Sequence, residues 1–298
     1  MRRLGLSLAL LLAAAPSTVA QVNYDTVQIR TVKAGDGVYM LMGVGGNIGV
    51  AAGPDGVLMV DGQYAPLSDK IKAAVAALGG PIRLLVNTHW HWDHIGGNET
   101  FARSGVVVVA HENVRHRMSV EQFVTAFNRH VPPSPAGALP LVTFTDSVSF
   151  YLNGDSIHVV HVPPAHTDGD ALIWFRRANV VHMGDLFFNG RYPFVDLSSG
   201  GSVEGMVAAV DRVLALADGN TKIIPGHGPL ADRATLQTYR DMLATVRDRI
   251  KGAVAAGQTL EQVQAAKPTT EFDAVWGKGT ITPKLFVEII YTDLSARK

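Results

Sequence analysis

Three histidines and an aspartate lie close together in the chain and have the side chains that bind metal ions. His89 and His91 are separated by one residue, Asp93 continues this alternation, and His94 follows directly. Alternate residues of an extended segment point to the same side, so His94 turns to a neighbouring face. Neutral imidazole and carboxylate groups suit Zn²⁺. The segment therefore predicts a site that can hold two adjacent metal ions.

Three more residues of the same types follow predicted strands. They are His166 after 157–162, Asp185 after 180–182 and His227 after 222–224. Functional groups collect at the carboxyl ends of strands in layered α/β folds. We therefore expect these distant positions to converge with the histidine segment.

Short β-branched runs and glycine-rich turns predict the strands that must position these residues. We expect strands at 38–42, 48–52, 57–60, 82–86, 106–110, 142–144, 148–152, 157–162, 171–176, 180–182 and 222–224. Apolar residues at helical spacing predict helices over 66–78, 236–250, 260–266 and 283–294, and a short helix from the histidine segment to Arg103. Strands and helices alternate before and after an irregular stretch, which indicates an α/β fold of two layered halves.

The irregular stretch covers 113–141 and includes a proline-rich loop. We expect a helical piece over 120–127. A loop of this length in a compact domain is usually a lid or a binding loop.

The sequence His-Trp-His-Trp-Asp-His at 89–94, together with His166, Asp185 and His227, resembles the metal-binding motifs of the metallo-β-lactamase superfamily of hydrolases. The resemblance covers roughly 38–230 and implies a four-layer αββα sandwich with a two-metal site at one edge. It implies that one Zn²⁺ is bound by His89, His91 and His166, a second by Asp93, His94 and His227, and that Asp185 bridges the two. Asp61, directly after the strand 57–60, resembles the family's early aspartate and is expected to orient the ligand loop. The natural metal could also be Fe²⁺ or Mn²⁺.

The resemblance implies hydrolysis of a cyclic amide or ester by a hydroxide shared between the metals, because coordination lowers the pKa of water to roughly 7. Asp93 is then the expected proton shuttle. Asn189 and Tyr192, shortly after Asp185, are expected to contact substrate. Trp90 and Trp92 are expected to form walls of the site or to pack.

The choice of substrate stays open at this stage. The superfamily includes β-lactamases, lactonases and thioester hydrolases such as glyoxalase II. Export favours β-lactamase-like action, but such enzymes generally have Cys or Ser where this chain has Asp185, and a bridging Asp is typical of lactonases and glyoxalase II. An alternative of another class is a metal-binding periplasmic accessory protein with little catalysis. The complete ligand set argues against it, because a pure binding module needs no open metal position.

Charge and cysteine content limit the possible partners. The 298 residues include 26 basic and 26 acidic side chains, so the formal net charge is zero. Nucleic-acid binders usually carry a basic excess, so we expect a small-molecule substrate and no nucleic acid. The absence of cysteine excludes disulfides, thiol nucleophiles and thiolate metal ligands. Nothing in the sequence indicates an oligomeric state.

The first residues have the pattern of an export signal. Arg2 and Arg3 precede an apolar run over 4–15, and small residues follow up to Ala20. This run is shorter than the roughly 20 residues that a permanent membrane helix needs. We expect a signal peptide over 1–20, one domain over 21–298, no permanent membrane anchor, and a periplasmic or secreted protein.

Overall fold

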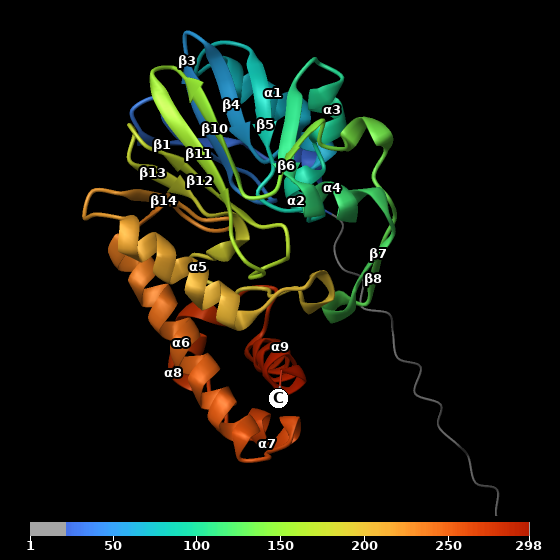
Figure 1. Ribbon diagram of the computed structural model, residues 1–298, viewed down its shortest axis with the longest axis vertical. Helices are drawn as coiled ribbons and strands as arrows, with labels where there is room; N and C mark the ends of the chain where they lie inside the picture. Colours follow the sequence, from blue (N-terminus) through green and yellow to red (C-terminus); the bar gives the residue numbers. More distant parts are fainter. Residues whose placement is uncertain (1–21, 298) are drawn as a thin grey trace, which may run out of the picture.

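Two β-sheets form the centre of the computed structural model, which describes residues 22–297 (Figure 1). The first sheet has the strand order β1-β2-β3-β4-β5-β6-β9. Its strands are β1 (Arg30–Gly35), β2 (Val38–Met42), β3 (Ile48–Gly53), β4 (Gly56–Val60), β5 (Ile82–Val86), β6 (Val107–His111) and β9 (Val142–Phe144). Neighbours from β1 to β4 are antiparallel, and those from β4 to β9 are parallel.

The second sheet has the strand order β10-β11-β12-β13-β14-β15. Its strands are β10 (Ser147–Leu152), β11 (Asp155–His161), β12 (Ala171–Phe175), β13 (Val180–His182), β14 (Lys222–Ile224) and β15 (Ala231–Asp232). Only β13 and β14 pair in parallel, so both strands end at the same edge of the sheet.

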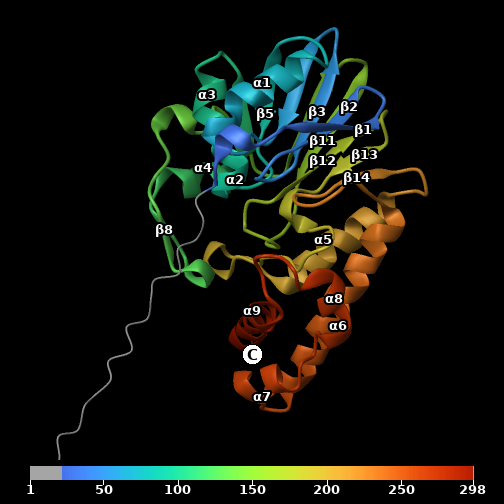
Figure 2. The ribbon, with the colours of Figure 1, turned by 180° about the vertical axis from the view of Figure 1, so that it is seen from behind.

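Helices cover the outer face of each sheet (Figures 1 and 2). On the first sheet lie α1 (Ser68–Ala76) and α3 (Asn98–Ala102), while α2 (Trp92–Ile95) and α4 (Glu112–Ser119) lie near its edge. On the second sheet lie α5 (Val203–Leu216) and α6 (Arg233–Ala255). Helix α9 (Pro283–Ala296) packs on α6 farther from the sheet, and the short α7 (Leu260–Ala265) and α8 (Thr270–Trp276) lie between α6 and α9 in the chain. The predicted four-layer αββα sandwich is confirmed.

Strand β4 shows why the layers assemble in this way. All of its residues are buried. Leu58 and Val60 pack in the core between the sheets, whereas Val57 and Met59 pack in the core under α1. A strand covered on both faces needs apolar residues at every position rather than at alternate ones. The second sheet is covered in the same way, because Ile173 faces the inter-sheet core and Leu172 faces the helices.

The structure corrects two expectations about secondary structure. Residues 120–127 are not helical: β7 (Gln122–Val124) and β8 (Arg129–Val131) form an antiparallel hairpin, joined by a 3₁₀ turn and Asn128 in the left-handed region. Helices α5 and α8 and strands β1 and β15 were missing from the sequence prediction. The predicted signal peptide falls on residues outside the described range.

The β7–β8 hairpin extends from the edge of the first sheet toward the loop before α5 (Figure 1). Its turn is fixed there because the Thr125 amide donates to Ser198 Oγ at 3.0 Å and the Phe127 ring lies 4.7 Å from the Phe194 ring. The stretch 113–141 is therefore folded against the body of the protein. Between residues 22 and 297, no helix is both long and apolar enough to cross a membrane.

Candidate metal centre

All seven predicted metal ligands lie together at one edge of the two sheets. They come from segments that follow four strands: His89, His91, Asp93 and His94 after β5, His166 after β11, Asp185 after β13 and His227 after β14. The parallel pairing of β13 with β14 brings Asp185 and His227 to the same edge. The structure thus assembles the site that the spacing predicts, although metal binding itself remains a prediction.

The first group of ligand atoms comprises His89, His91, His166 and Asp185, which are all buried and lie within 4.8 Å of one another. His166 Nε2 faces His91 Nδ1 at 2.9 Å. Asp185 Oδ2 lies 3.6 Å from His166 Nε2 and 3.9 Å from His89 Nε2. Three imidazole nitrogens and one carboxylate oxygen therefore converge on one point, a donor set that suits zinc.

The second group comprises Asp93, His94 and His227. His227 Nε2 lies 3.3 Å from Asp93 Oδ2. Asp185 also reaches this group, because its Oδ1 is 3.2 Å from His94 Nε2 and its Oδ2 is 3.4 Å from His227 Nε2. The Asp185 carboxylate thus lies between the two groups, as a bridging ligand must.

Hydrogen bonds to the second ring nitrogen orient the histidines. Asp61 Oδ2 lies 2.8 Å from His94 Nδ1, which agrees with the orienting role expected for this aspartate. His166 Nδ1 donates to the carbonyl oxygen of Phe194 at 2.7 Å, and His89 Nδ1 lies 3.0 Å from Thr88 Oγ1. Such contacts fix the tautomer and direct the other nitrogen toward a metal.

Asp61 is held firmly in this role. It is fully buried and adopts a left-handed backbone conformation with φ of 65°. Its carboxylate also accepts from the Thr88 amide at 2.8 Å and from the Thr88 hydroxyl at 2.7 Å. Asp61 therefore ties the end of β4 to the start of the ligand segment.

The sequence analysis missed the partner of His91. Asp196 Oδ2 lies 2.9 Å from His91 Nε2, and it also accepts from the Ser199 hydroxyl at 2.6 Å. Ser199 in turn accepts from the Trp90 indole at 3.0 Å. Asp196 follows no strand, so the strand-end criterion could not find it. Its only sequence signal is an aspartate directly after the apolar pair Phe194-Val195.

The polar atoms at the centre fit a metal ion. His89 Nε2, His94 Nε2 and Asp185 Oδ1 are buried, yet they make no hydrogen bond within residues 22–297. Buried polar atoms without a partner are costly and rare in proteins. A cation bound by these atoms would satisfy them, so the residues present fit a two-metal site.

Two histidines of the cluster are neutral near pH 7, whereas Asp185 is charged. Burial, together with His94 and His166, lowers the pKa of His89 well below its usual value, and burial with His91 lowers the pKa of His166 to about 4. Both rings are therefore neutral near pH 7, the form that binds metals. Burial would raise the pKa of Asp185, but His227 and His94 lower it well below the usual value. The Asp185 carboxylate is thus ionised.

The glycine-rich loop between β2 and β3 packs directly on the second group. A side chain at Gly46 would overlap the ring of His94. Asn47 at the end of this loop donates to the carbonyl oxygens of Pro225 at 2.9 Å and Gly228 at 2.8 Å. The loop is therefore hydrogen-bonded to the turn that carries His227 on both sides of that residue.

The two predicted substrate contacts have different surroundings. Tyr192 is buried, its ring stacks on Phe286 at 4.4 Å, and its hydroxyl donates to Asp273 at 2.8 Å. This expectation is therefore wrong, because the residue anchors the C-terminal helices. Asn189 donates to the carbonyl oxygen of Pro229 at 2.9 Å, so its amide supports the turn after His227.

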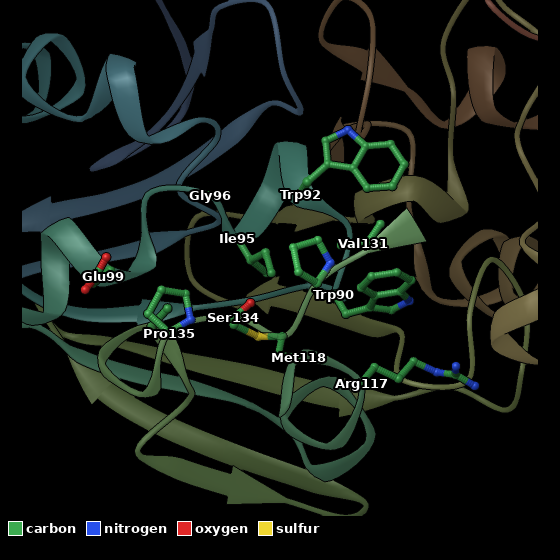
Figure 3. Close-up of a pocket in the computed structure, with 12 residues that line it drawn as sticks. Trp90, Trp92, Ile95, Gly96, Glu99, Arg117, Met118, Val131, Ser134 and Pro135 are labelled. Carbon is green, nitrogen blue, oxygen red and sulfur yellow. The ribbon is translucent and has the colours of Figure 1, made fainter. Parts of the chain in front are cut away.

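An apolar cavity of about 280 Å³ lies beside the ligand segment (Figure 3). Trp90, Trp92 and Ile95 line it from the ligand segment and α2, and Met118 and Val131 from α4 and β8. The expectation that the two tryptophans form walls agrees with this position. His91, which lies between them in the chain, points into the cluster instead, because neighbouring residues of the extended segment face opposite sides.

Comparison with known proteins identifies the family. The family model described as the metallo-beta-lactamase superfamily matches residues 41–227, which is more than half of the chain. The chain belongs to the metallo-beta-lactamase superfamily. The matched range includes every residue of the cluster, from His89 to His227.

Relatives in this superfamily have different activities. The chain is 21% identical over 184 residues to the metallo-beta-lactamase type 2 of Bacteroides fragilis, covering 58% of this chain and 68% of that protein. It is 28% identical over 209 residues to a hydroxyacylglutathione hydrolase of Methylococcus capsulatus, covering 65% and 71%. A probable metallo-hydrolase of Bacillus subtilis is 26% identical over 172 residues, covering 55% and 76%.

Solved structures show the same fold. The metallo-beta-lactamase from Pontibacter korlensis superposes with a TM-score of 0.59 at 20% identity, covering 73% of this chain and 99% of that one. The DIM-1 metallo-beta-lactamase has a TM-score of 0.59 at 17% identity, covering 74% and 99%. The superfamily membership and the histidine–aspartate cluster together support a metal-dependent hydrolase.

Proposed function

We propose that the protein is a binuclear zinc-dependent hydrolase that cleaves a cyclic amide or ester, with β-lactamase-like action as the leading candidate. The position of Asp185 carries this proposal, since its carboxylate lies within 3.9 Å of histidine nitrogens from both ligand groups. The match to a metallo-beta-lactamase supports the choice of reaction.

The residues of the cluster have distinct roles in this proposal. His89, His91 and His166 would hold one ion, Asp93, His94 and His227 the other, and Asp185 both. Bound zinc supplies Lewis acidity and lowers the pKa of water from 15.7 to roughly 7. Burial of the histidines and their carboxylate partners keeps the ligands in one geometry before substrate arrives.

Asp93 is the proposed proton shuttle. Its side chain is partly exposed, at 17%, while the other carboxylate of the cluster, Asp185, is 5% exposed. Burial would raise the pKa of Asp93, but His94 and His227 lower it to about 2, so the group is an ionised acceptor near neutral pH. In the proposed reaction, water adds to the carbonyl carbon, Asp93 Oδ2 receives the proton, and that proton passes to the leaving nitrogen or oxygen as its bond to carbon breaks.

A lactonase or thioester hydrolase of the glyoxalase II type is the second candidate. Asp185 favours it, because the β-lactamases of the superfamily generally have Cys or Ser at this position. Matches to hydroxyacylglutathione hydrolases at 28% identity also favour it. The third candidate, a metal-binding accessory protein with little catalysis, would show no turnover on any of these substrates.

Turnover of nitrocefin, a homoserine lactone and a glutathione thioester by the zinc-loaded protein would separate these candidates. We expect nitrocefin to be hydrolysed, and expect Asp185→Cys to raise the ratio of nitrocefin to thioester turnover. Preference for the lactone or thioester would select the second candidate. Stable zinc binding with no turnover of any substrate would contradict hydrolysis and favour the accessory protein.

Export forms part of the proposal. The basic and apolar pattern of residues 1–20 supports a signal peptide and a periplasmic or secreted location. Sequencing the N-terminus of protein recovered from the periplasm or the medium would test this, with Gln21 expected as the first residue. An intact Met1 in protein confined to the cytoplasm would contradict it.

A further inference from the structure

Arg129 on β8 is an exposed cation without an acidic partner in the described part of the chain. Its guanidinium carbon lies 3.8 Å from the ring centroid of Trp92, so the cation lies over the face of the indole. None of the carboxylates described between residues 22 and 297 lies within 4 Å of it as an ion pair. Stacking occupies a face of the guanidinium and leaves its N–H edges free to donate.

Neighbouring charges do not neutralise this arginine. Glu121, just before the same hairpin, pairs with His130 at 2.8 Å. Arg117 on α4 is already held by Asp168, with two hydrogen bonds of 2.7 Å. Of these cations, Arg129 is the one available to an anion from solution.

Trp92 places Arg129 beside the metal cluster. Trp92 directly precedes Asp93, and its ring centroid lies 5.5 Å from that of the ligand His91. Figure 3 shows the Trp92 ring next to the strand that carries Val131, two residues after Arg129. Burial, and then Asp93, raises the pKa of Tyr64, whereas Arg129 lowers it, so both charges act on this residue.

The hairpin that carries Arg129 is fixed relative to the metal ligands. The Phe127 ring packs 4.7 Å from Phe194, which stacks 5.7 Å from the ring of His91. The turn is also hydrogen-bonded to Ser198, two residues after Asp196. The Trp92 ring thus contacts both Arg129 and the His91 ring, and the Phe127 ring packs on Phe194, which also stacks on His91.

We propose that Arg129 determines substrate specificity by binding an anionic group, such as a carboxylate, on a substrate whose apolar part lies on Trp92 and Phe127. This inference rests on the proposed hydrolase function for the reaction itself. The guanidinium presents a planar set of donors that matches a carboxylate, and its stacking on Trp92 reduces the freedom lost on binding. A neutral substrate gains nothing from this contact.

Two matched esters test the inference through kinetics. Para-acetoxybenzoate carries a carboxylate, and para-acetoxybenzamide is its neutral counterpart with the same scissile acetate ester. For the zinc-loaded protein, we expect Arg129→Gln to lower kcat/KM for the benzoate by roughly tenfold, mainly through KM, and to change the benzamide less than about twofold. Arg129→Lys should restore part of the loss, because it keeps the charge but not the planar fork.

A matched control comes from α5, where Arg212 is also exposed and has no ion pair among the described residues. Arg212→Gln should leave both esters unchanged. Equal losses on the benzoate and the benzamide in Arg129→Gln, or no loss on either, would overturn the inference.

Binding of benzoate and benzamide gives a readout independent of turnover. Titration followed by tryptophan fluorescence should show a roughly tenfold higher Kd for benzoate in Arg129→Gln, with benzamide unchanged. If neither ester is hydrolysed by any variant but this loss of benzoate binding is seen, the anion site is supported and the proposed hydrolase function fails. If Arg129→Gln binds benzoate as well as the wild type does, the inference is overturned whatever the activity.

Discussion

At the scale of single residues, the site depends on pairs in which a buried acceptor orients a ligand. Asp61 fixes His94, Asp196 fixes His91, and the Phe194 carbonyl fixes His166. Each contact uses the ring nitrogen that faces away from the cluster. The ligand nitrogens are therefore directed before any metal binds.

Asp196→Asn tests this orienting role. The asparagine still accepts hydrogen bonds but loses the charge that stabilises the His91 ring and its tautomer. We expect zinc affinity to fall by about 10-fold to 100-fold, measured by competition with a chelating dye. Asp211→Asn on α5 removes an exposed carboxylate and should leave the affinity unchanged. Unaltered zinc affinity in Asp196→Asn would contradict the assignment.

The sequence predicted the members of the histidine–aspartate cluster better than the residues that orient them. The members of the cluster are histidines and aspartates that follow β-branched strands, a signal that is local in the chain. Asp196 and Ser199 act on His91 across 105 or more positions, and Tyr192 is buried by Phe286 from the last helix. Contacts between such distant segments exist only in the folded chain. The spacing of residues in the sequence therefore does not reveal Asp196, and it does not show that Tyr192 is buried under the last helix.

At the scale of elements, the glycine-rich loop between β2 and β3 allows the close approach that the second ligand group needs. Gly46 is buried and its Cα faces the imidazole of His94 without space for a methyl group. The loop must therefore be glycine here for steric reasons.

Gly46→Ala should force the loop and His94 apart. We expect a loss of about 1 to 3 kcal/mol in the free energy of unfolding, measured by urea denaturation, together with weaker zinc binding. Gly252→Ala is the control without a steric clash, because this α6 glycine is exposed and a methyl group there meets nothing within 4 Å. It should stabilise the protein by about 0.5 to 1 kcal/mol. Equal effects of the two substitutions would contradict the steric argument.

The elements that the sequence failed to predict are those whose stability depends on tertiary contacts. Residues 120–127 have helical spacing of apolar residues, but Val124 is buried in the core and the partly buried Phe127 packs against Phe194, and these contacts stabilise a hairpin instead. Helix α5 was missed although Val203, Val207 and Val210 line one face, since β-branched residues and Gly205 weaken a helical pattern. The central strands, whose apolar runs are local, were predicted at nearly their observed bounds.

At the scale of the whole molecule, two histidines join the two sheets. The ring of His111 at the end of β6 stacks on that of His161 at the end of β11, with centroids 3.9 Å apart. His111 Nε2 donates to the Thr145 carbonyl, and His161 Nδ1 to the Asp170 carbonyl.

This stack predicts a loss of stability in acid. Burial, and then His111, lowers the pKa of His161 below 6.5, although Asp168 and Asp146 oppose this. As pH falls through 6.5, His161 takes up a proton in the unfolded chain before it does so in the folded chain. The folding stability that is present above this pH is therefore lost below it. Urea denaturation from about pH 7 to about pH 5 should show a smaller decrease in His161→Gln than in the wild type. Parallel pH profiles would contradict this contribution.

The central claim is that one cluster, bridged by Asp185, holds two metal ions that are required for hydrolysis. The most direct test measures zinc content by mass spectrometry and hydrolytic turnover in the same samples, before chelation, after chelation and after zinc is returned. The account predicts about two zinc ions per chain, loss of turnover with the metal, recovery with zinc, and a lower zinc content in Asp185→Asn. Full turnover in protein from which all metal has been removed would contradict it.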